Sequence, residues 1–300
     1  MTGIWVDTDF GFDDLWALLL LRHLGCAVAG VSLVAGNTLL PQVARNAAGA
    51  KTAYGFDWPL WQGASRPLVR APETATRILG PTGMRSRGKM LSSTDKDLPP
   101  PGAVDALANW LRSDLGTPRE ILVLGPLTNI ARCLEAFPDL VGRIGRLVWM
   151  GGSAGPGNHT ALAEFNAVAD AEALDVVLAA DLPLDVVDLT FCRTVTFGPD
   201  DMPDADPLTW DLVGGYLDIA LERGRPGMAI YDPLAALAIA RPESILFTPC
   251  TITVETDATE AYGATTFTTA GSRTRRSVGA TGDLARLCLD ALEREVVDGP

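Results

Sequence analysis

The chain has little histidine, few basic residues and no long apolar run. It holds two histidines in 300 residues, and its 24 lysines and arginines are outnumbered by 37 acidic residues, which gives a net charge of −13. Because nucleic acid and anionic membranes attract a basic surface, this charge argues against either as the main partner. No apolar stretch is long enough to cross a bilayer. Metal ions and neutral small molecules remain as candidate partners.

Cysteine is also scarce. The five cysteines are scattered, odd in number and never spaced as Cys-x-x-Cys, which favours reduced thiols in the core. The first predicted strand has begun by the fourth residue, so we expect no signal peptide. We therefore expect a cytoplasmic protein.

Eight residues near the N-terminus carry four carboxylates. The run Asp7-Thr8-Asp9-Phe10-Gly11-Phe12-Asp13-Asp14 lies between a predicted buried strand, residues 3–6, and a predicted apolar helix, residues 15–21. In an open α/β sheet, ligands bind where strands end. Four like charges this close repel one another, and burying any of them unpaired is costly. A hard divalent cation with oxygen ligands removes that conflict, so the run predicts a metal site.

Strand-like and helix-like segments alternate along most of the chain. This alternation is typical of an α/β fold with a doubly wound, mostly parallel open sheet of the Rossmann-like kind. Beyond residue 209 the pattern changes to helices 210–222 and 233–240, an antiparallel-looking stretch 250–269 and a final helix 284–295. Because no internal repeat or linker interrupts the chain, we predict a single domain, residues 1–300, with an appended C-terminal helical and antiparallel part. The other predicted strands are 27–35, 58–61, 120–124, 146–150 and 184–188, and the other predicted helices are 42–54, 103–112, 127–136 and 171–180.

Residues 64–101 break the alternation, because they are irregular and rich in glycine, proline and arginine. Such a length without secondary structure suggests a functional loop. A basic loop over an acidic metal site could accept a phosphate on the substrate. We favour the alternative, a solvated surface loop in an acidic protein. The basic residues are Arg66, Arg70, Arg77, Arg85, Arg87 and Lys89.

Polar side chains follow several predicted strands. If the sheet is parallel, several of them lie on the same edge as the acidic run, where asparagine and glutamate can hold the hydroxyls of a polyol. Each alone could be structural: Asn37 as a helix cap, Asp232 before Pro233 as an ordinary helix start, and Asp13 and Asp14 as first-turn acids. Together they are harder to dismiss. The set is Asn37, Asn129, Asn158, His159, Glu164, Asn166 and Asp232.

The acidic run resembles the D-T-D-x-G-x-D-D signature of the inosine–uridine type nucleoside hydrolases, and the resemblance covers nearly the full length. That family cleaves the N-glycosidic bond of ribonucleosides with water, using bound Ca²⁺. The resemblance thus implies an enzyme that converts a small-molecule nucleoside into ribose and free base, as a homodimer or homotetramer. The other matching segments are Val34-Ala35-Gly36-Asn37, Gly125-Pro126-Leu127-Thr128-Asn129-Ile130-Ala131, Ala163-Glu164-Phe165-Asn166 with Asp170 and Glu172, and Asp232-Pro233-Leu234-Ala235.

The resemblance also implies a role for each matching residue. Asp9, Asp14, Asp232 and the backbone carbonyl of Leu124 would bind Ca²⁺, and Asp7 would support the cluster. Because calcium takes about 6–8 oxygens, water and a ribose diol can complete the shell. The metal would lower the pKa of its bound water, and Asp9 would take the proton as general base. The ribose hydroxyls would be held by Asp13, Asn37, Asn158, Glu164 and Asn166.

The sequence departs from the family pattern at the residue that would protonate the leaving base. Family members carry a histidine immediately before the final Asp-Pro, as the acid that protonates the departing base, whereas this chain has Tyr231; a second family histidine aligns with Leu79. Tyrosine, with an ordinary pKa near ~10, is a weaker acid, and general acid catalysis is worth about 10²–10⁴-fold. Tyr231 could donate the proton, aromatics could activate the base by stacking, or the substrate could have a better leaving group. Tyr231 could also be a packing aromatic. The stacking candidates are Trp210, Tyr216 and Tyr231.

Two other functions are open from the sequence. A haloacid-dehalogenase type phosphatase would use Asp7 as nucleophile and Asp9 as acid, but that hypothesis leaves the Asp13-Asp14 pair unexplained. A nucleoside- or ribose-binding homologue with weak or no activity would keep the metal and ribose residues and lack the acid. His23 is expected to be structural, whereas His159 could approach the site.

Overall fold

The computed structural model describes residues 3–113, 118–269 and 273–293. Its centre is an eight-stranded sheet in the order β3-β2-β1-β4-β5-β6-β12-β9. Neighbouring strands from β3 to β12 are parallel, and β9 pairs antiparallel with β12. The predicted doubly wound, mostly parallel α/β fold is therefore confirmed. The strands are β1 (Ile4–Thr8), β2 (Val28–Leu33), β3 (Leu60–Gln62), β4 (Arg119–Val123), β5 (Ile144–Met150), β6 (Leu184–Val187), β9 (Ile245–Pro249) and β12 (Thr274–Ala280).

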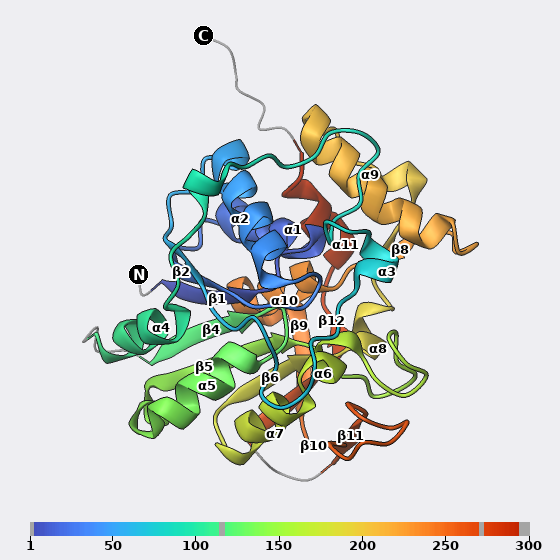
Figure 1. The fold of residues 1–300 in the computed structure, drawn as a ribbon. Helices are drawn as coiled ribbons and strands as arrows, with labels where there is room; N and C mark the ends of the chain where they lie inside the picture. The colour runs from blue at the N-terminus through green and yellow to red at the C-terminus, as the bar shows by residue number, and fades with distance from the viewer. Residues whose placement is uncertain (1–2, 114–117, 270–272, 294–300) are drawn as a thin grey trace.

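Helices cover both faces of the sheet (Figure 1). On one face α1 (Phe12–His23) packs against α10 (Asp232–Ala240), beside α2 (Leu40–Tyr54), α9 (Pro207–Leu221) and α11 (Leu284–Asp290). On the other face α5 (Thr128–Ala136) packs between α4 (Ala103–Arg112) and α7 (Ala171–Ala179). Every side chain of α1 from Leu15 to Leu21 is buried, which explains its unbroken apolar sequence. No helix in the described ranges is long and apolar enough to cross a membrane.

The order of the strands reverses between β1 and β4. The chain builds outward from β1 through β2 to β3, then returns to the other side of β1 and continues through β4, β5 and β6. In such sheets ligands bind in the crevice beyond the carboxyl ends of the strands that flank the reversal. The acidic run leaves β1 at this point, and Leu124 follows β4 beside it. The fold thus places two predicted parts of the site at the same edge.

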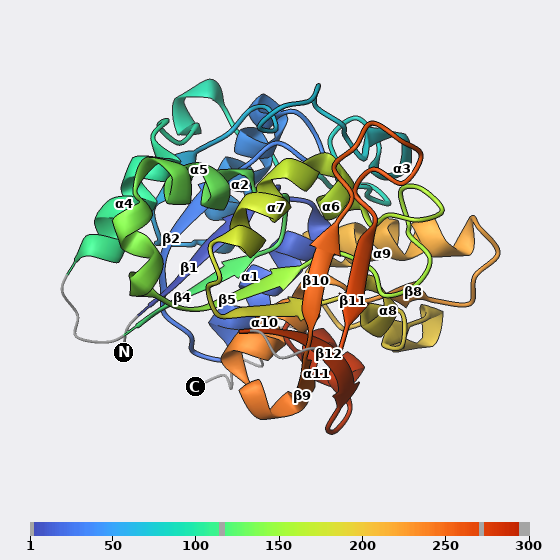
Figure 2. The ribbon, with the colours of Figure 1, turned by 90° about the horizontal axis from the view of Figure 1, so that it is seen from below.

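The C-terminal part is more closely joined to the main sheet than we predicted. The hairpin of β10 (Thr251–Val254) and β11 (Thr265–Thr268) forms a sheet of its own, as the stretch 250–269 suggested (Figure 2). By contrast, β9 and β12 extend the central sheet, and neither was predicted. Arg275 of β12 pairs with buried Asp185 at 2.7 Å. Because the charge is balanced by this distant partner, the charged sequence of β12 did not indicate a strand of the central sheet. The predicted helix 284–295 ends at Asp290, and residues 294–295 lie outside the described residues.

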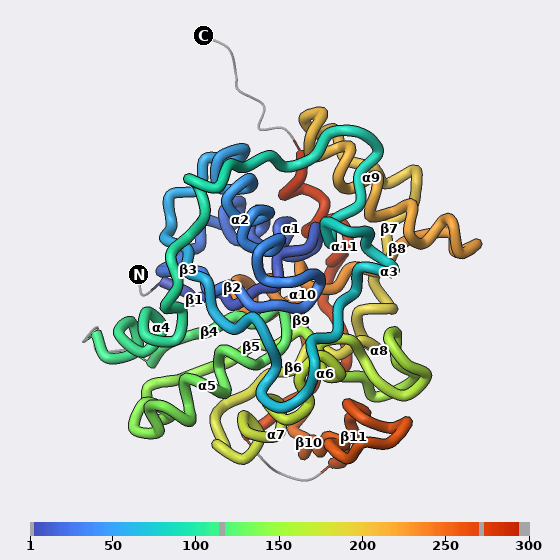
Figure 3. Tube along the Cα trace, in the orientation of Figure 1, coloured from blue at the N-terminus to red at the C-terminus, as the bar shows by residue number. Residues whose placement is uncertain are grey.

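Residues 64–101 form the mainly irregular segment that we predicted (Figure 3). Arg85 pairs with Glu222 at 2.7 Å, and Arg87 pairs with Asp218 of α9 at 2.6 Å. These ion pairs fasten the segment to the end of α9 and favour the surface-loop interpretation over a phosphate site. The remaining elements are α3 (Thr76–Leu79), α6 (Phe165–Ala169), α8 (Leu189–Cys192), the paired strands β7 (Thr196–Phe197) and β8 (Met228–Ala229), and the 3-10 turns Asp95–Asp97, Pro138–Arg143, Pro199–Asp201 and Pro242–Ser244.

Candidate active site

A pocket of about 220 Å³ opens at the carboxyl edge of the sheet. Sites for drug-sized ligands measure about 300–1,000 Å³, so this pocket suits one small molecule. Of the residues predicted for catalysis, metal binding and ribose binding, all but Asp7 and Asp14 line this pocket. Those that line it are Asp9, Asp13, Asn37, Leu124, Asn158, Glu164, Asn166, Tyr231 and Asp232.

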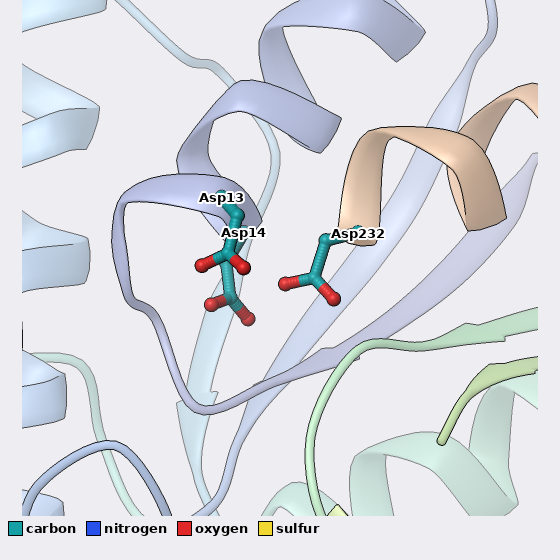
Figure 4. Close-up of side chains that lie close together, drawn as sticks. All are labelled: Asp13, Asp14 and Asp232. Atoms are coloured by element: carbon teal, nitrogen blue, oxygen red, sulfur yellow. The ribbon is translucent and has the colours of Figure 1, made fainter. Parts of the chain in front are cut away.

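Three carboxylates, two from pocket-lining residues and one from behind the pocket, lie close together (Figure 4). One oxygen from each of Asp13, Asp14 and Asp232 lies within 4.8 Å of the other two. Asp13 and Asp14 lie in the first turn of α1, and Asp232 begins α10. Because a helix N-terminus carries partial positive charge, both helices help to hold this negative charge. The resemblance assigns Asp13 to the ribose, yet its oxygen lies in the group with those of Asp14 and Asp232, whereas Asp9, a predicted metal ligand, is not part of this group.

Asp9 is fixed by Asn37. The backbone N–H of Asn37 donates to Asp9 Oδ2 at 2.7 Å, and its side-chain amide donates to Oδ1 at 3.0 Å. This contact requires glycine at position 36, because a Cβ there would collide with the Asp9 carboxylate. Phe10, the residue after Asp9, has φ = 50°, a conformation that non-glycine residues seldom adopt outside functional sites. The turn thus holds Asp9 against the pocket.

Asp14 and Asp7 lie behind the pocket. Asp14 accepts hydrogen bonds from the Thr8 hydroxyl and from the backbone N–H of Gly11, the latter at 2.7 Å. Asp7 accepts from the Ser32 hydroxyl and from the Asn129 amide, the latter at 2.8 Å, and its Oδ2 has no hydrogen-bond partner in the described parts of the chain. A buried carboxylate outside the pocket cannot attack a substrate, which argues against the phosphatase hypothesis.

The acidic cluster holds more negative charge than its surroundings stabilise. Burial raises the pKa of Asp7 to about 7, and burial together with the charge of Asp13 raises the pKa of Asp14 to about 7. Burial, then the neighbouring carboxylates, raises the pKa of Asp9 and of Asp232 well above the usual range. Carboxylate and carbonyl oxygens are the ligands that hard divalent cations prefer. The donor set and its mutual repulsion therefore fit a cation such as Ca²⁺.

The predicted ribose residues are partly used within the protein. Glu164 begins α6 and accepts backbone N–H bonds from Gly152 and Asn166, both at 2.9 Å. The Asn166 amide donates to the carbonyl of Leu124 at 2.9 Å, which leaves the Asn166 side-chain oxygen for a ligand. Asn158 Oδ1 accepts from the backbone N–H of Phe165 at 2.9 Å, which leaves its amide N–H groups. Burial raises the pKa of Glu164 to about 7.

Comparison with known proteins decides which family this is. The sequence model for the inosine-uridine preferring nucleoside hydrolases matches residues 4–287. The chain belongs to that family. It is 33% identical over 270 residues to the non-specific ribonucleoside hydrolase RihC of Escherichia coli, covering 87% of this chain and 86% of RihC. It is 40% identical over 177 residues to an uncharacterized protein of Schizosaccharomyces pombe, covering 59% of this chain and 53% of that protein.

A solved structure shows that the fold is shared as well. The plant nucleoside hydrolase PpNRh1 superposes with a TM-score of 0.85 at 22% identity, over 97% of this chain and 98% of that one. Nucleoside hydrolases are N-glycosyl hydrolases, so the predicted family and enzyme class are confirmed.

Two tyrosines form part of the pocket wall. Tyr231 lines the pocket, and burial raises its pKa to about 12, although the positive charges of Arg193 and Arg225 act in the opposite direction. Tyr216 also lines the pocket, and its hydroxyl donates to Asp13 at 3.0 Å. Trp210, a predicted stacking residue, is not a lining residue; it is 41% exposed and lies beneath Arg87.

His159, which we expected could approach the site, lines the pocket, and so does Leu79, the residue that aligns with the second family histidine. His159 Nε2 lies at 3.4 Å from Glu73 Oε1, and Leu79 of α3 lines the pocket as an apolar residue. Sequence reasoning missed Arg193, and it missed the lining residues that follow Tyr216 on α9 and beyond. A helical stripe at spacings of three and four from Tyr216 would have identified the first of them. The missed lining residues include Arg193, Ile219, Ala220, Arg223, Arg225 and Met228.

Proposed function

We propose that this chain hydrolyses the N-glycosidic bond of a ribonucleoside in a Ca²⁺-dependent reaction that gives ribose and free base. One observation carries the proposal. The oxygens of Asp13, Asp14 and Asp232 lie within 4.8 Å of one another, and Asp13 and Asp232 line the same small pocket as polar groups able to hold a ribose. The family membership and the ribonucleoside hydrolase activity named for RihC support the same reaction.

The cation would be held by oxygens that line the pocket together with the Asp14 carboxylate behind it. Asp9, Asp14, Asp232 and the Leu124 carbonyl are the proposed ligands, and Asp13 lies close enough to contribute. When bound, the cation would neutralise the carboxylates and lower the pKa of a water molecule. Asp7 would keep the cluster in place through its hydrogen bonds to β2 and α5.

The protein side chains then supply the steps of hydrolysis. Asp9 accepts a proton from the attacking water, whose oxygen forms the new bond to the anomeric carbon as the electron pair of the C–N bond passes to the base. Asp13 and Glu164 place negative charge beside the sugar while it gains oxocarbenium character. Hydroxyl contacts orient the anomeric carbon toward the water. The proposed hydroxyl-binding residues are Asp13, Asn37, Asn158, Glu164 and Asn166.

Tyr231 occupies the position of the missing histidine acid. Its buried hydroxyl, with a pKa raised to about 12, is a weak proton donor at neutral pH. We therefore assign Tyr231 first to the wall against which the base lies, and to proton donation only if the leaving group needs one.

The test is a panel of purine and pyrimidine nucleosides incubated with the protein and Ca²⁺ and resolved by chromatography. We expect base and ribose in equal amounts from at least one nucleoside. Asp9→Ala should lower the rate by about 10²–10⁴-fold, the usual contribution of a general base. Asp57→Ala, which removes an exposed carboxylate outside the pocket, should leave it unchanged. Binding of nucleosides without release of any base would support the binding-protein alternative.

We further propose that the protein acts in the cytoplasm as a homodimer or homotetramer. All five cysteines are free thiols, which suits a reducing compartment. The proposed oligomer rests on the resemblance to the family, and light scattering of the purified protein would test it.

A further inference from the structure

The outer end of the pocket is basic, unlike its acidic inner end. Arg193, Arg223 and Arg225 all line it. Arg223 and Arg225 lie in the exposed turn that follows α9 (Figure 1). In a protein of net charge −13, a cluster of guanidinium groups at the mouth of one small pocket calls for an explanation.

One face of α9 connects the two ends of the pocket. Tyr216, Ile219 and Ala220 line the pocket from one face of α9, and Arg223, in the turn just after the helix, continues the same spacing of three and four. This row of residues begins at Asp13, to which Tyr216 donates a hydrogen bond at 3.0 Å. Arg223 follows about 10 Å further along the helix direction. A nucleoside whose ribose contacts Asp13 would therefore extend its base toward the arginine turn.

The turn that carries Arg223 and Arg225 has a defined backbone. Gly224 adopts φ = 68°, its N–H donates to the Leu221 carbonyl at 2.9 Å, and the Arg225 N–H donates to the Ala220 carbonyl at 3.1 Å. This is the Schellman arrangement that ends helices at a left-handed glycine. Both arginines are thus held beside the pocket mouth, one on each side of Gly224.

The guanidinium groups of Arg223 and Arg225 are available to a ligand. Within residues 3–113, 118–269 and 273–293, neither makes a side-chain hydrogen bond or an ion pair. Nearby arginines, by contrast, have partners. Arg85 donates hydrogen bonds to both carboxylate oxygens of Glu222, and Arg193 donates to backbone carbonyls at 2.6 and 2.7 Å. The charge of Arg225 reaches the Tyr231 hydroxyl, at the end of the pocket where the base must leave.

On the basis of the proposed hydrolase function, we propose that Arg223 and Arg225 recognise an anionic group on the base, and that the preferred substrates are ribonucleosides whose base carries a carboxylate. A guanidinium binds a carboxylate through two parallel N–H···O bonds, which supplies both energy and orientation. Arg193, whose N–H groups already hold the loop at Gly157, adds positive charge without contacting the ligand.

The experiment compares uridine with uridine bearing a carboxylate at C5 or at C6. Both kcat/KM and the dissociation constant are measured with Ca²⁺ present. We expect the protein to favour at least one carboxylated nucleoside over uridine by about 10- to 100-fold, the usual contribution of a charged hydrogen-bonded pair. Arg223→Gln and Arg225→Gln should each reduce the ratio of kcat/KM for the carboxylated nucleoside to kcat/KM for uridine, and the double variant should bring this ratio close to one.

Arg241→Gln is the matched control, because Arg241 also ends a helix but lies outside the pocket. The control matters because cations near a helix C-terminus stabilise the helix through its dipole. If Arg223 and Arg225 serve only that purpose, their variants will melt at lower temperature and keep the substrate preference, which overturns the proposal.

Equal affinity of the unaltered protein for uridine and both carboxylated forms also overturns the proposal. Failure of the proposed hydrolase function would look different, because no nucleoside would then lose its base. The ratio of the dissociation constants for uridine and its carboxylated forms could still be measured, so the two failures can be told apart.

Discussion

Removing divalent cations should make the folded protein less stable as the pH rises toward neutrality. The reason lies in Asp14, whose pKa burial and the charge of Asp13 raise from 3.8 to about 7 in the folded chain. Between those two values the folded state holds a proton that the unfolded state has lost. The stabilisation is therefore fully present below about pH 4 and is lost as the pH rises through about 7.

The size of the effect follows from the shift. One pKa unit corresponds to about 1.4 kcal/mol, so a single such carboxyl lowers the free energy of unfolding by about 2–3 kcal/mol between about pH 5 and 7. For a chain of this size that is a fall in melting temperature of roughly 3–5 °C. Calcium should reverse the loss, because cation binding requires the deprotonated carboxylates and stabilises by about 2.7 kcal/mol at a hundred times its dissociation constant.

Thermal melting of chelator-treated protein, from about pH 5 to 8 at constant ionic strength and with or without Ca²⁺, measures both effects. The variant Asp14→Asn keeps the acceptor for the Thr8 hydroxyl but removes the titrating group, so its melting temperature should depend less on pH. The reasoning is refuted if the metal-free protein becomes more stable between about pH 5 and 7, or if Ca²⁺ raises the melting temperature equally at both ends of the range.

Three further substitutions test individual contacts. If no side chain protonates the leaving base, Tyr231→His should supply a proton donor and raise kcat on neutral nucleosides by about 10²-fold. An unchanged kcat would show that the leaving base needs no proton donor. Asn129→Ala should lower the free energy of unfolding, measured in urea, by about 1–3 kcal/mol, because Asp7 and the backbone N–H of Ala64 lose their partner. Tyr216→Phe should raise KM by about 2- to 10-fold through the lost bond to Asp13, and an effect on kcat alone would contradict that role.

Much of the site could be predicted because parallel strands end at one edge. The run from Asp7 to Asp14 follows β1, Asn37 lies beyond β2, and Leu124 follows β4, so their convergence required only the correct strands. The predicted fold class held for the same reason, since the buried strands and α1 have apolar sequences that reveal their type.

Features that depend on distant partners could not be predicted. The arginines of β12 conceal a strand because their charges are balanced by Asp185 and Asp188, which lie elsewhere in the sequence. Arg223 and Arg225 look like ordinary surface residues in the sequence, and only the path of α9 past Tyr216 brings them to the pocket. Likewise, nothing local shows that the Asn166 amide binds the Leu124 carbonyl.

The most direct test of the central claim follows the oxygen of water into the product. A nucleoside that the panel identifies as a substrate is treated with the Ca²⁺-loaded protein in ¹⁸O-labelled water without phosphate, and ribose and base are analysed by mass spectrometry at early times. We predict that the ribose carries a single heavy oxygen and that the base carries none. We also predict that Asp9→Ala releases both products much more slowly than the unaltered protein. Base release that requires phosphate, or release that Asp9→Ala leaves unchanged, would contradict hydrolysis at this acidic cluster.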